Sequence, residues 1–248
     1  MLTLVHCGYH KCLTVFSARC FTDVLGDRFH NFEGDDAGFY SRHPRYELSA
    51  VTDFKLNLSR LGDCRISRFI RDPRDMVVSG YLYHRKGVEA WTNEVFTTPP
   101  LWRLLVESAG LVLPTESYSS ALRRLDEEDG LIAEMLFRKR TFQDMFRWPE
   151  NDPRIRVWKY EDILGHEAET MDAVGEHYGW IDGEGLERRA LLKQRADFWR
   201  AGDGRLSWDN HVRNPQAGQW RDLFTPKVRS AFEALYRGLP QRLGYDPS

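Results

Sequence analysis

The first 25 residues constrain the fold of this chain more than any other stretch. An apolar run at residues 2–5 predicts a buried strand, Gly8 interrupts that run, and a second apolar stretch at residues 15–25 predicts a helix. Lys11 lies in the loop between them. A strand, a loop and a helix in this order direct backbone N–H groups toward one point, which favours the binding of an anion. Because the pattern GxxxxGK[ST] is absent, the usual nucleoside triphosphate loop is not expected.

Strands and helices alternate along the rest of the chain. Apolar runs predict strands at residues 48–54, 65–70 and 154–160, and a shorter strand within residues 27–45. Helical patterns occupy residues 167–178, 186–199 and 226–239, and residues 116–148 predict two helices divided near Gly130. This alternation predicts an α/β fold with a mostly parallel central sheet that is flanked by helices on both faces.

Polar residues mark the expected starts of several helices. Asp72 precedes Pro73, which predicts Asp72 as an N-cap and Pro73 as the first helical residue. Thr14 and Thr225 are predicted to cap the first and the last helix in a similar way.

The loops around Lys11 and Arg71 each follow a predicted strand. Because the carboxyl ends of parallel strands meet at one edge of a sheet, these loops are expected to face the same crevice. The whole chain, residues 1–248, is predicted to form a single domain. Residues 84–150 would form a largely helical and irregular insertion that faces the substrate.

The composition excludes several classes of protein. A formal net charge of −2 argues against a general nucleic-acid-binding protein, but it permits a small polyanion held by a few cations. No run of about 18 apolar residues occurs, so no membrane span is expected. The first strand begins directly after Met1 without a basic leader, which predicts a cytoplasmic protein without a signal peptide.

Cysteine and histidine residues gather near the first loop without the spacing of a metal site. His6, Cys7, His10 and Cys12 lie close together, but no second pair of ligands follows at zinc-finger spacing. Strand alternation also places His6 and Cys7 on opposite faces. We therefore expect no metal site, and the absence of paired CxxC spacing predicts no disulfide framework.

Several segments together resemble the sulfotransferases that use 3′-phosphoadenosine 5′-phosphosulfate (PAPS). Residues 10–16 (HKCLTVF) are similar to the family's 5′-phosphosulfate loop, and residues 71–79 (RDPRDMVVS) match its 3′-phosphate motif, R-[DN]-P-x-D-x-x-x-S, at every named position. Residues 213–221 (RNPQAGQWR) resemble its C-terminal R-K-G-x-x-G-x-W motif, and residues 160–162 resemble its Y-E-D. The order and approximate spacing of these motifs fit over nearly the whole chain.

This resemblance implies a P-loop-like sulfotransferase domain. Such an enzyme moves a sulfonate group from PAPS to a hydroxyl or amine of a small molecule or glycan, releases adenosine 3′,5′-bisphosphate (PAP), and needs no metal. Lys11 is the expected catalytic cation, because it would stabilise charge on the leaving 5′-phosphate. The expected nucleotide-binding residues are His10, Lys11, Cys12, Leu13, Thr14, Val15, Phe16, Arg71, Ser79, Tyr160, Arg213 and Asn214.

Different parts of the donor are expected to meet different residues. Arg71, Ser79 and Arg213 would clamp the 3′-phosphate, the arginines through paired hydrogen bonds. Leu13 and Val15 stand where the family commonly has a Gly and a second hydroxyl residue, so the backbone is expected to hold the 5′-phosphate.

Some roles stay open between a site and a structural function. Phe16 and Tyr160 are candidates to contact adenine, and Phe16 fits the core equally well. Asp53 is the expected general base that removes the acceptor's proton, with His43 and His84 as rivals. Capping the end of a strand is the alternative role for Asp53.

Two other functions remain as alternatives. The first is a P-loop kinase that phosphorylates a small molecule and needs ATP and magnesium. The second is a nucleotide-binding protein with a degenerate catalytic site. The acceptor is not identifiable from the sequence. The aromatic-rich residues 29–46 and 81–102 fit an acceptor pocket, the core or a homodimer surface.

Overall fold

The computed structural model describes residues 2–33, 35–53, 56–95, 109–111, 113, 115–149, 151–201 and 216–246. The chain divides into two compact units. The first unit comprises Met1–Arg71 and Trp148–Trp208, and the second comprises Asp72–Arg147 and Asp209–Ser248.

A five-stranded parallel sheet organises the first unit. Its strands are β1 (Thr3–Gly8), β2 (Phe29–Glu33), β3 (Leu48–Thr52), β4 (Cys64–Ile70) and β5 (Ile155–Lys159), in the order β2-β3-β1-β4-β5. Gly8 pairs with Thr52 of β3, and Cys7 pairs with Arg68 of β4. The chain therefore continues from β1 to one side of the sheet and later returns to the other side, which is the arrangement that places ligands at the end of the central strand. The predicted α/β class and the parallel sheet are confirmed.

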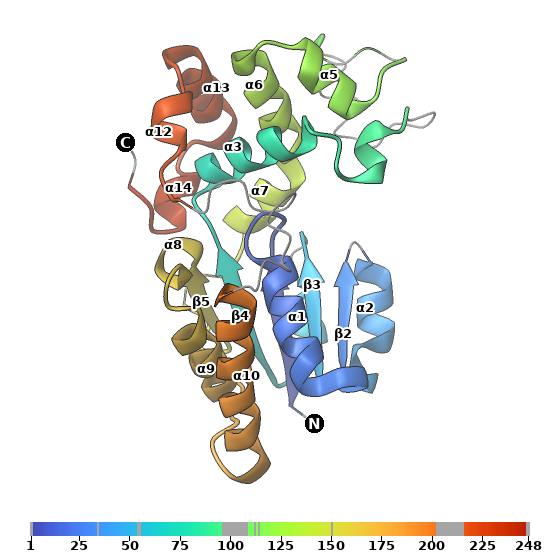
Figure 1. Ribbon diagram of the computed structural model, residues 1–248, viewed down its shortest axis with the longest axis vertical. Coiled ribbons are helices and arrows are strands. Elements are labelled where there is room, and N and C mark those ends of the chain that lie inside the picture. Colours follow the sequence, from blue (N-terminus) through green and yellow to red (C-terminus); the bar gives the residue numbers. More distant parts are fainter. Residues whose placement is uncertain are drawn as a thin grey trace. The chain divides into compact units, whose positions relative to one another are not determined.

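Helices pack on both faces of this sheet (Figure 1). On one face, α1 (Thr14–Leu25), α9 (Glu167–His177) and α10 (Gly183–Ala201) bury a core that includes Phe21, Met171 and Leu192. On the other face, α2 (Asp36–Arg42) contributes Phe39 to a second core, which also contains Trp148. The short helix α8 (Tyr160–Ile163) follows β5 directly. Single 3-10 turns lie at Gly26–Arg28, His43–Arg45 and Leu58–Arg60.

The second unit is helical in its described residues. It contains α3 (Pro73–His84), the 3-10 turn η4 (Ala90–Asn93), α5 (Tyr118–Arg124), α6 (Glu127–Phe137), α7 (Lys139–Phe146), α12 (Trp220–Leu223), α13 (Pro226–Tyr236) and α14 (Leu239–Arg242). Helix α3 packs against α5, α6 and α12, and α13 packs against α6. No helix among the described residues is long and apolar enough to cross a membrane.

The predicted break at Gly130 is wrong. Residues 116–148 contain three helices, and Gly130 lies inside α6. A Cβ atom at Gly130 would lie 2.4 Å from Cε2 of Tyr81, so glycine is present because α6 approaches the Tyr81 ring closely. The helices are separated instead at Leu125, which is extended, and at Arg138.

Two of the three predicted caps are confirmed. The side chain of Asp72 accepts a hydrogen bond from Arg74 N, and that of Thr225 accepts one from Val228 N. The third is wrong, because Thr14 is the first residue of α1 and Leu13 occupies the N-cap position in the left-handed region.

Candidate functional site

The loop of residues 9–13 connects β1 to α1 and has an unusual backbone. Lys11 has φ of 74° and Leu13 has φ of 61°, both in the left-handed region that favours glycine. Leu13 makes no side-chain cap hydrogen bond to the first-turn N–H groups of α1. These N–H groups carry the positive end of the helix dipole. The backbone of the loop is thus suited to hold an anion without help from hydroxyl side chains.

Close packing fixes where the loop starts. A Cβ atom at Gly8 would lie 2.9 Å from Cγ2 of Thr14, so the end of β1 packs tightly against the start of α1. A turn closes over the loop through the 2.8 Å hydrogen bond from Cys12 N to Tyr9 O. Because the chain turns within this short loop, Leu13 takes the N-cap position and Thr14 becomes the first residue of α1.

Arg71 joins this loop from the neighbouring strand. It follows β4, its side chain is buried with 3% of its surface exposed, and its Nη1 donates a hydrogen bond of 3.4 Å to Lys11 O. The Arg71 guanidinium also lies 4.2 Å from the ring centre of Tyr160, the first residue of α8. Arg71 and the Lys11 loop are therefore in contact at one edge of the sheet, and the crevice that they were expected to face stays a prediction.

Arg71 retains unused hydrogen-bonding capacity. Its Nε and Nη2 atoms are buried, and neither has a hydrogen-bond partner among the described residues. Buried donors of this kind are rare, and an unpaired charged donor is costly. An anion with two oxygens toward the guanidinium would satisfy both atoms.

Phe16 and Asp53 are held by contacts within the same unit. Phe16 is 7% exposed and packs with Cys20 in the core under α1, so the structure gives it at least a packing role. Asp53 accepts a hydrogen bond of 3.0 Å at Oδ1 from His10 N. Adenine contact by Phe16 and proton abstraction by Asp53 stay predictions.

Three of the predicted nucleotide ligands are not described as part of the first unit. Ser79 is half-buried on α3 in the second unit. Arg213 and Asn214 fall outside the described residues. In the second unit Asp75 accepts hydrogen bonds from Gly218 N at 2.6 Å and from Trp220 N at 3.0 Å, so it holds the start of α12.

His6 lies in the interior of the first unit and takes no part in the loop. Its Nδ1 lies 2.7 Å from Ser67 Oγ, which in turn lies 2.6 Å from the hydroxyl of Tyr178. The ring packs edge-on against Phe69 with 4.7 Å between ring centres. Burial lowers the pKa of His6 to about 3, so the imidazole is neutral at physiological pH.

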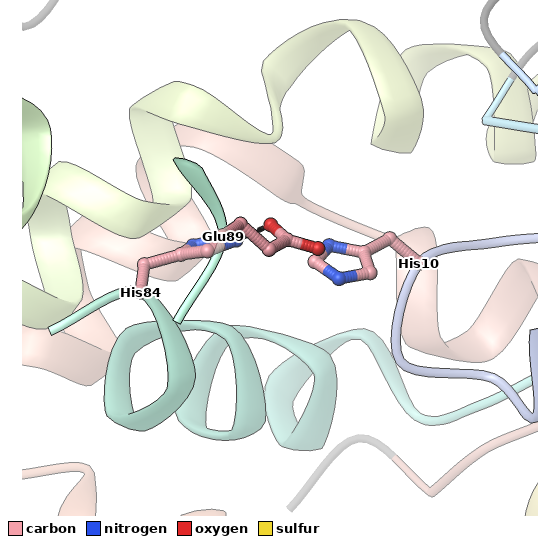
Figure 2. A group of neighbouring side chains, drawn as sticks. All are labelled: His10, His84 and Glu89. Atoms are coloured by element: carbon pink, nitrogen blue, oxygen red, sulfur yellow. Dashed lines mark ion pairs between the residues drawn. The ribbon is translucent and has the colours of Figure 1, made fainter. Parts of the chain in front are cut away.

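A buried carboxylate in the second unit went unrecognised in the sequence. Glu134 is fully buried and binds His84 Nδ1 at 2.8 Å, the Tyr118 hydroxyl at 3.0 Å and Arg138 Nε at 2.7 Å. Burial by itself raises the pKa of Glu134, but the charges and hydrogen bonds of these partners outweigh it and hold the pKa below its usual value. Figure 2 shows His84 beside Glu89, whose Oε2 lies 3.7 Å from His84 Nε2.

The sequence contained one signal for this carboxylate. Leu131, Ala133 and Met135 surround Glu134 in α6, and all three are buried. A glutamate within such an apolar segment is expected to be paired if the helix is buried on more than one side.

A pocket of about 280 Å³ lies beside the loop in the first unit. It extends along α1 over the ends of β2 and β3, and its lining includes Thr14, Ala18, Thr22, Asn31, Glu33 and Thr52. Apolar surface, to which Val15 and Ala18 belong, is thus combined in this pocket with hydroxyl, amide and carboxylate groups.

Comparison with known proteins supports one fold. No family model and no curated protein sequence matches this chain. A mouse sulfotransferase, SULT7A1, complexed with PAP, matches in structure with a TM-score of 0.51 and 17% identity over 98% of this chain and 85% of that chain. Retinol dehydratase in a complex with retinol and PAP matches with a TM-score of 0.51 and 12% identity over 96% and 81%.

These likenesses cover nearly the whole chain at low sequence identity, so they concern the fold. The chain has the fold of PAPS-dependent sulfotransferases. The fold that the motifs implied is thereby confirmed.

Proposed function

We propose that this protein is an enzyme that transfers a sulfonate group from PAPS to an acceptor hydroxyl or amine and releases PAP. The observation that carries the proposal is Arg71, a buried guanidinium that touches the Lys11 loop and keeps Nε and Nη2 without partners among the described residues. PAPS presents a 3′-phosphate and a 5′-phosphosulfate, and its two anionic ends suit these two adjoining elements.

Each element would bind one part of the donor. The N–H groups at the start of α1 and the left-handed loop would hold the 5′-phosphate. Arg71 would bind the 3′-phosphate through Nε and Nη2, while Tyr160 keeps the guanidinium plane in place. The contribution of Ser79, Arg213 and Asn214 to binding of the 3′-phosphate, which the sequence motifs imply, stays a prediction.

The reaction needs a proton acceptor and a charge stabiliser. The acceptor oxygen or nitrogen attacks sulfur and loses its proton to a base, and the bond from sulfur to the bridging oxygen breaks. The electron pair of that bond stays on the 5′-phosphate of PAP. Lys11 would stabilise this developing charge, because its ammonium belongs to the loop that is proposed to hold the 5′-phosphate.

The acceptor is proposed to be a small molecule or glycan. The sheet order places Arg71 and Tyr160 at the ends of β4 and β5, so the sulfonate would extend from the loop toward β3 and β2. The pocket along α1 lies on that side, and its mixed lining suits an acceptor that presents both apolar surface and hydroxyl groups.

Calorimetry with PAP tests the proposal directly. We expect saturable binding of PAP without added metal, and weaker binding of ATP with magnesium. Absence of any PAP binding at high micromolar concentration would overturn the proposal, and tighter binding of magnesium ATP would favour a kinase. Binding of PAP without turnover of PAPS on a panel of phenols, sugars and amines would favour the degenerate nucleotide-binding protein.

A further inference from the structure

Asp53 contacts both the end of β1 and the loop of residues 9–13, which is called the donor loop here because it is proposed to bind PAPS. Asp53 directly follows β3, and its N–H donates a hydrogen bond of 3.1 Å to Gly8 O, which extends the β1–β3 ladder beyond the Gly8–Thr52 pair. Its carboxylate Oδ1 accepts a hydrogen bond of 3.0 Å from His10 N, across 43 positions of sequence. One residue therefore holds the chain on both sides of Tyr9.

The backbone at Asp53 is shaped for this double contact. Its φ is 63°, in the left-handed region that non-glycine residues adopt at an energetic cost. Aspartate and asparagine tolerate this region better than other side chains. A strand end that needed only a polar cap would not require this conformation, whereas the turn at Asp53 brings its carboxylate to His10.

We propose that Asp53 is a positioning residue for the donor loop and not the general base. The proposal rests on the proposed sulfonate transfer. Asp53 fixes the His10 peptide, and the next residue, Lys11, is thereby held where its ammonium meets the 5′-phosphosulfate. A general base takes up the acceptor's proton in every turnover. Protonation of Asp53 would weaken the hydrogen bond from His10 N during the transfer step, when Lys11 must be held in place.

Three variants separate the two roles. Asp53→Asn keeps an oxygen acceptor and tolerates the left-handed backbone, but it cannot serve as a base. Asp53→Ala removes the acceptor, and Asp53→Gly removes it while relieving the backbone strain. We expect Asp53→Asn to retain kcat within about threefold, whereas Asp53→Ala and Asp53→Gly lose about tenfold or more and also bind PAP more weakly.

The pH profile gives an independent check. In Asp53→Asn the pH dependence of kcat/KM should match that of the wild type. If Asp53→Asn is as inactive as Asp53→Ala while its PAP affinity is unchanged, Asp53 is the base and the proposal is overturned. If Asp53→Gly behaves as the wild type does, the side-chain bond to His10 is dispensable and the proposal is overturned as well.

Amide hydrogen exchange tests the same contact without a donor. The peptide covering residues 8–16 should exchange faster in Asp53→Ala than in the wild type, and Asp53→Asn should restore protection. Equal protection in Asp53→Ala and the wild type would overturn the proposal. A wild type that neither binds PAP nor transfers sulfonate, yet shows this exchange pattern, would overturn the proposed function while leaving the loop contact demonstrated.

Discussion

The guanidinium of Arg71 donates a hydrogen bond from Nη1 to the backbone carbonyl of Lys11, at 3.4 Å and across 60 positions of sequence. This contact exists because β4, which precedes Arg71, pairs directly with β1, which precedes the Lys11 loop. The cation and the loop that are proposed to bind the two ends of the donor are therefore fixed to one another before any nucleotide binds.

Replacing Arg71 by lysine should selectively weaken recognition of the 3′-phosphate. Lysine keeps the charge but loses the paired donors and the planar contact with Tyr160. We expect the Kd of PAP to rise about 10- to 100-fold, which corresponds to the loss of a charged hydrogen bond. Adenosine 5′-phosphate, which has no 3′-phosphate, is the control ligand for calorimetry. An equal loss of affinity for both nucleotides would show that Arg71 stabilises the fold of the site and does not bind the 3′-phosphate.

Lys11→Met should abolish catalysis more than binding. The methionine fills a similar volume without the charge that stabilises the leaving phosphate, so the transfer rate should fall by about 100-fold or more. The Kd of PAP should change much less, because the loop backbone remains. Lys193→Met, on an exposed position of α10, is the matched control and should keep wild-type rates. Near-normal turnover in Lys11→Met would exclude Lys11 from the catalytic role.

His6 should make the protein less stable in acid. Burial lowers its pKa to about 3, whereas in the unfolded chain it is about 6.5, so below that pH the unfolded chain binds a proton that the folded chain does not. The contribution of neutral, buried His6 to the free energy of unfolding is fully present above pH 6.5 and is lost as the pH falls toward 3. Through this residue, a change from about pH 7.5 to about pH 5 should lower the free energy of unfolding by about 2 kcal/mol.

The measurement is urea unfolding of the wild type and His6→Gln at these two pH values. The variant is expected to be less stable at the higher pH, because it disturbs the contact with Ser67, but the difference should shrink by about 2 kcal/mol at the lower pH. A difference that is independent of pH would contradict the role of His6.

Glu134→Gln should destabilise the second unit. The substitution keeps the shape but removes the charge that pairs with buried Arg138, and a buried ion that loses its partner typically costs about 3–5 kcal/mol. Glu127→Gln, at an exposed position of the same helix, is the control and should change stability by less than about 0.5 kcal/mol. Thermal unfolding measures both. A similar small effect in the two variants would show that the buried pair contributes little.

Gly130→Ala separates helix propensity from packing. Propensity alone predicts that alanine stabilises α6 by about 1 kcal/mol. The added Cβ would lie 2.4 Å from the Tyr81 ring, so we expect destabilisation of about 1–3 kcal/mol instead. In a Tyr81→Ala background the substitution should no longer destabilise, and chemical unfolding of the four proteins in this cycle measures the coupling. A stabilised single variant would show that Tyr81 moves aside freely.

Local sequence patterns were sufficient for most elements and for the class of fold. Asp72 and Thr225 cap helices as predicted, because a cap depends on residues within one helical turn. The apolar runs become the parallel strands, since the side-chain periodicity of a strand is a local property. The motif around Arg71 also implied the fold that the structural likeness to sulfotransferases supports.

Other features depend on residues that meet only in the folded chain. Gly130 resembles a helix break until Tyr81 packs on it, and Thr14 resembles a cap until the loop places Leu13 in the left-handed region. The bond from His10 to Asp53 likewise depends on the pairing of β1 with β3.

Local sequence patterns specified the strands, most helix starts and the order of the motifs, because neighbouring residues specify backbone conformation. Three features depend on the folded chain: the burial of Arg71 against the Lys11 loop, the hydrogen bond by which Asp53 holds this loop, and the internal charge of Glu134. Burial and long-range pairing set the cost of each charge, and both arise when distant segments pack together.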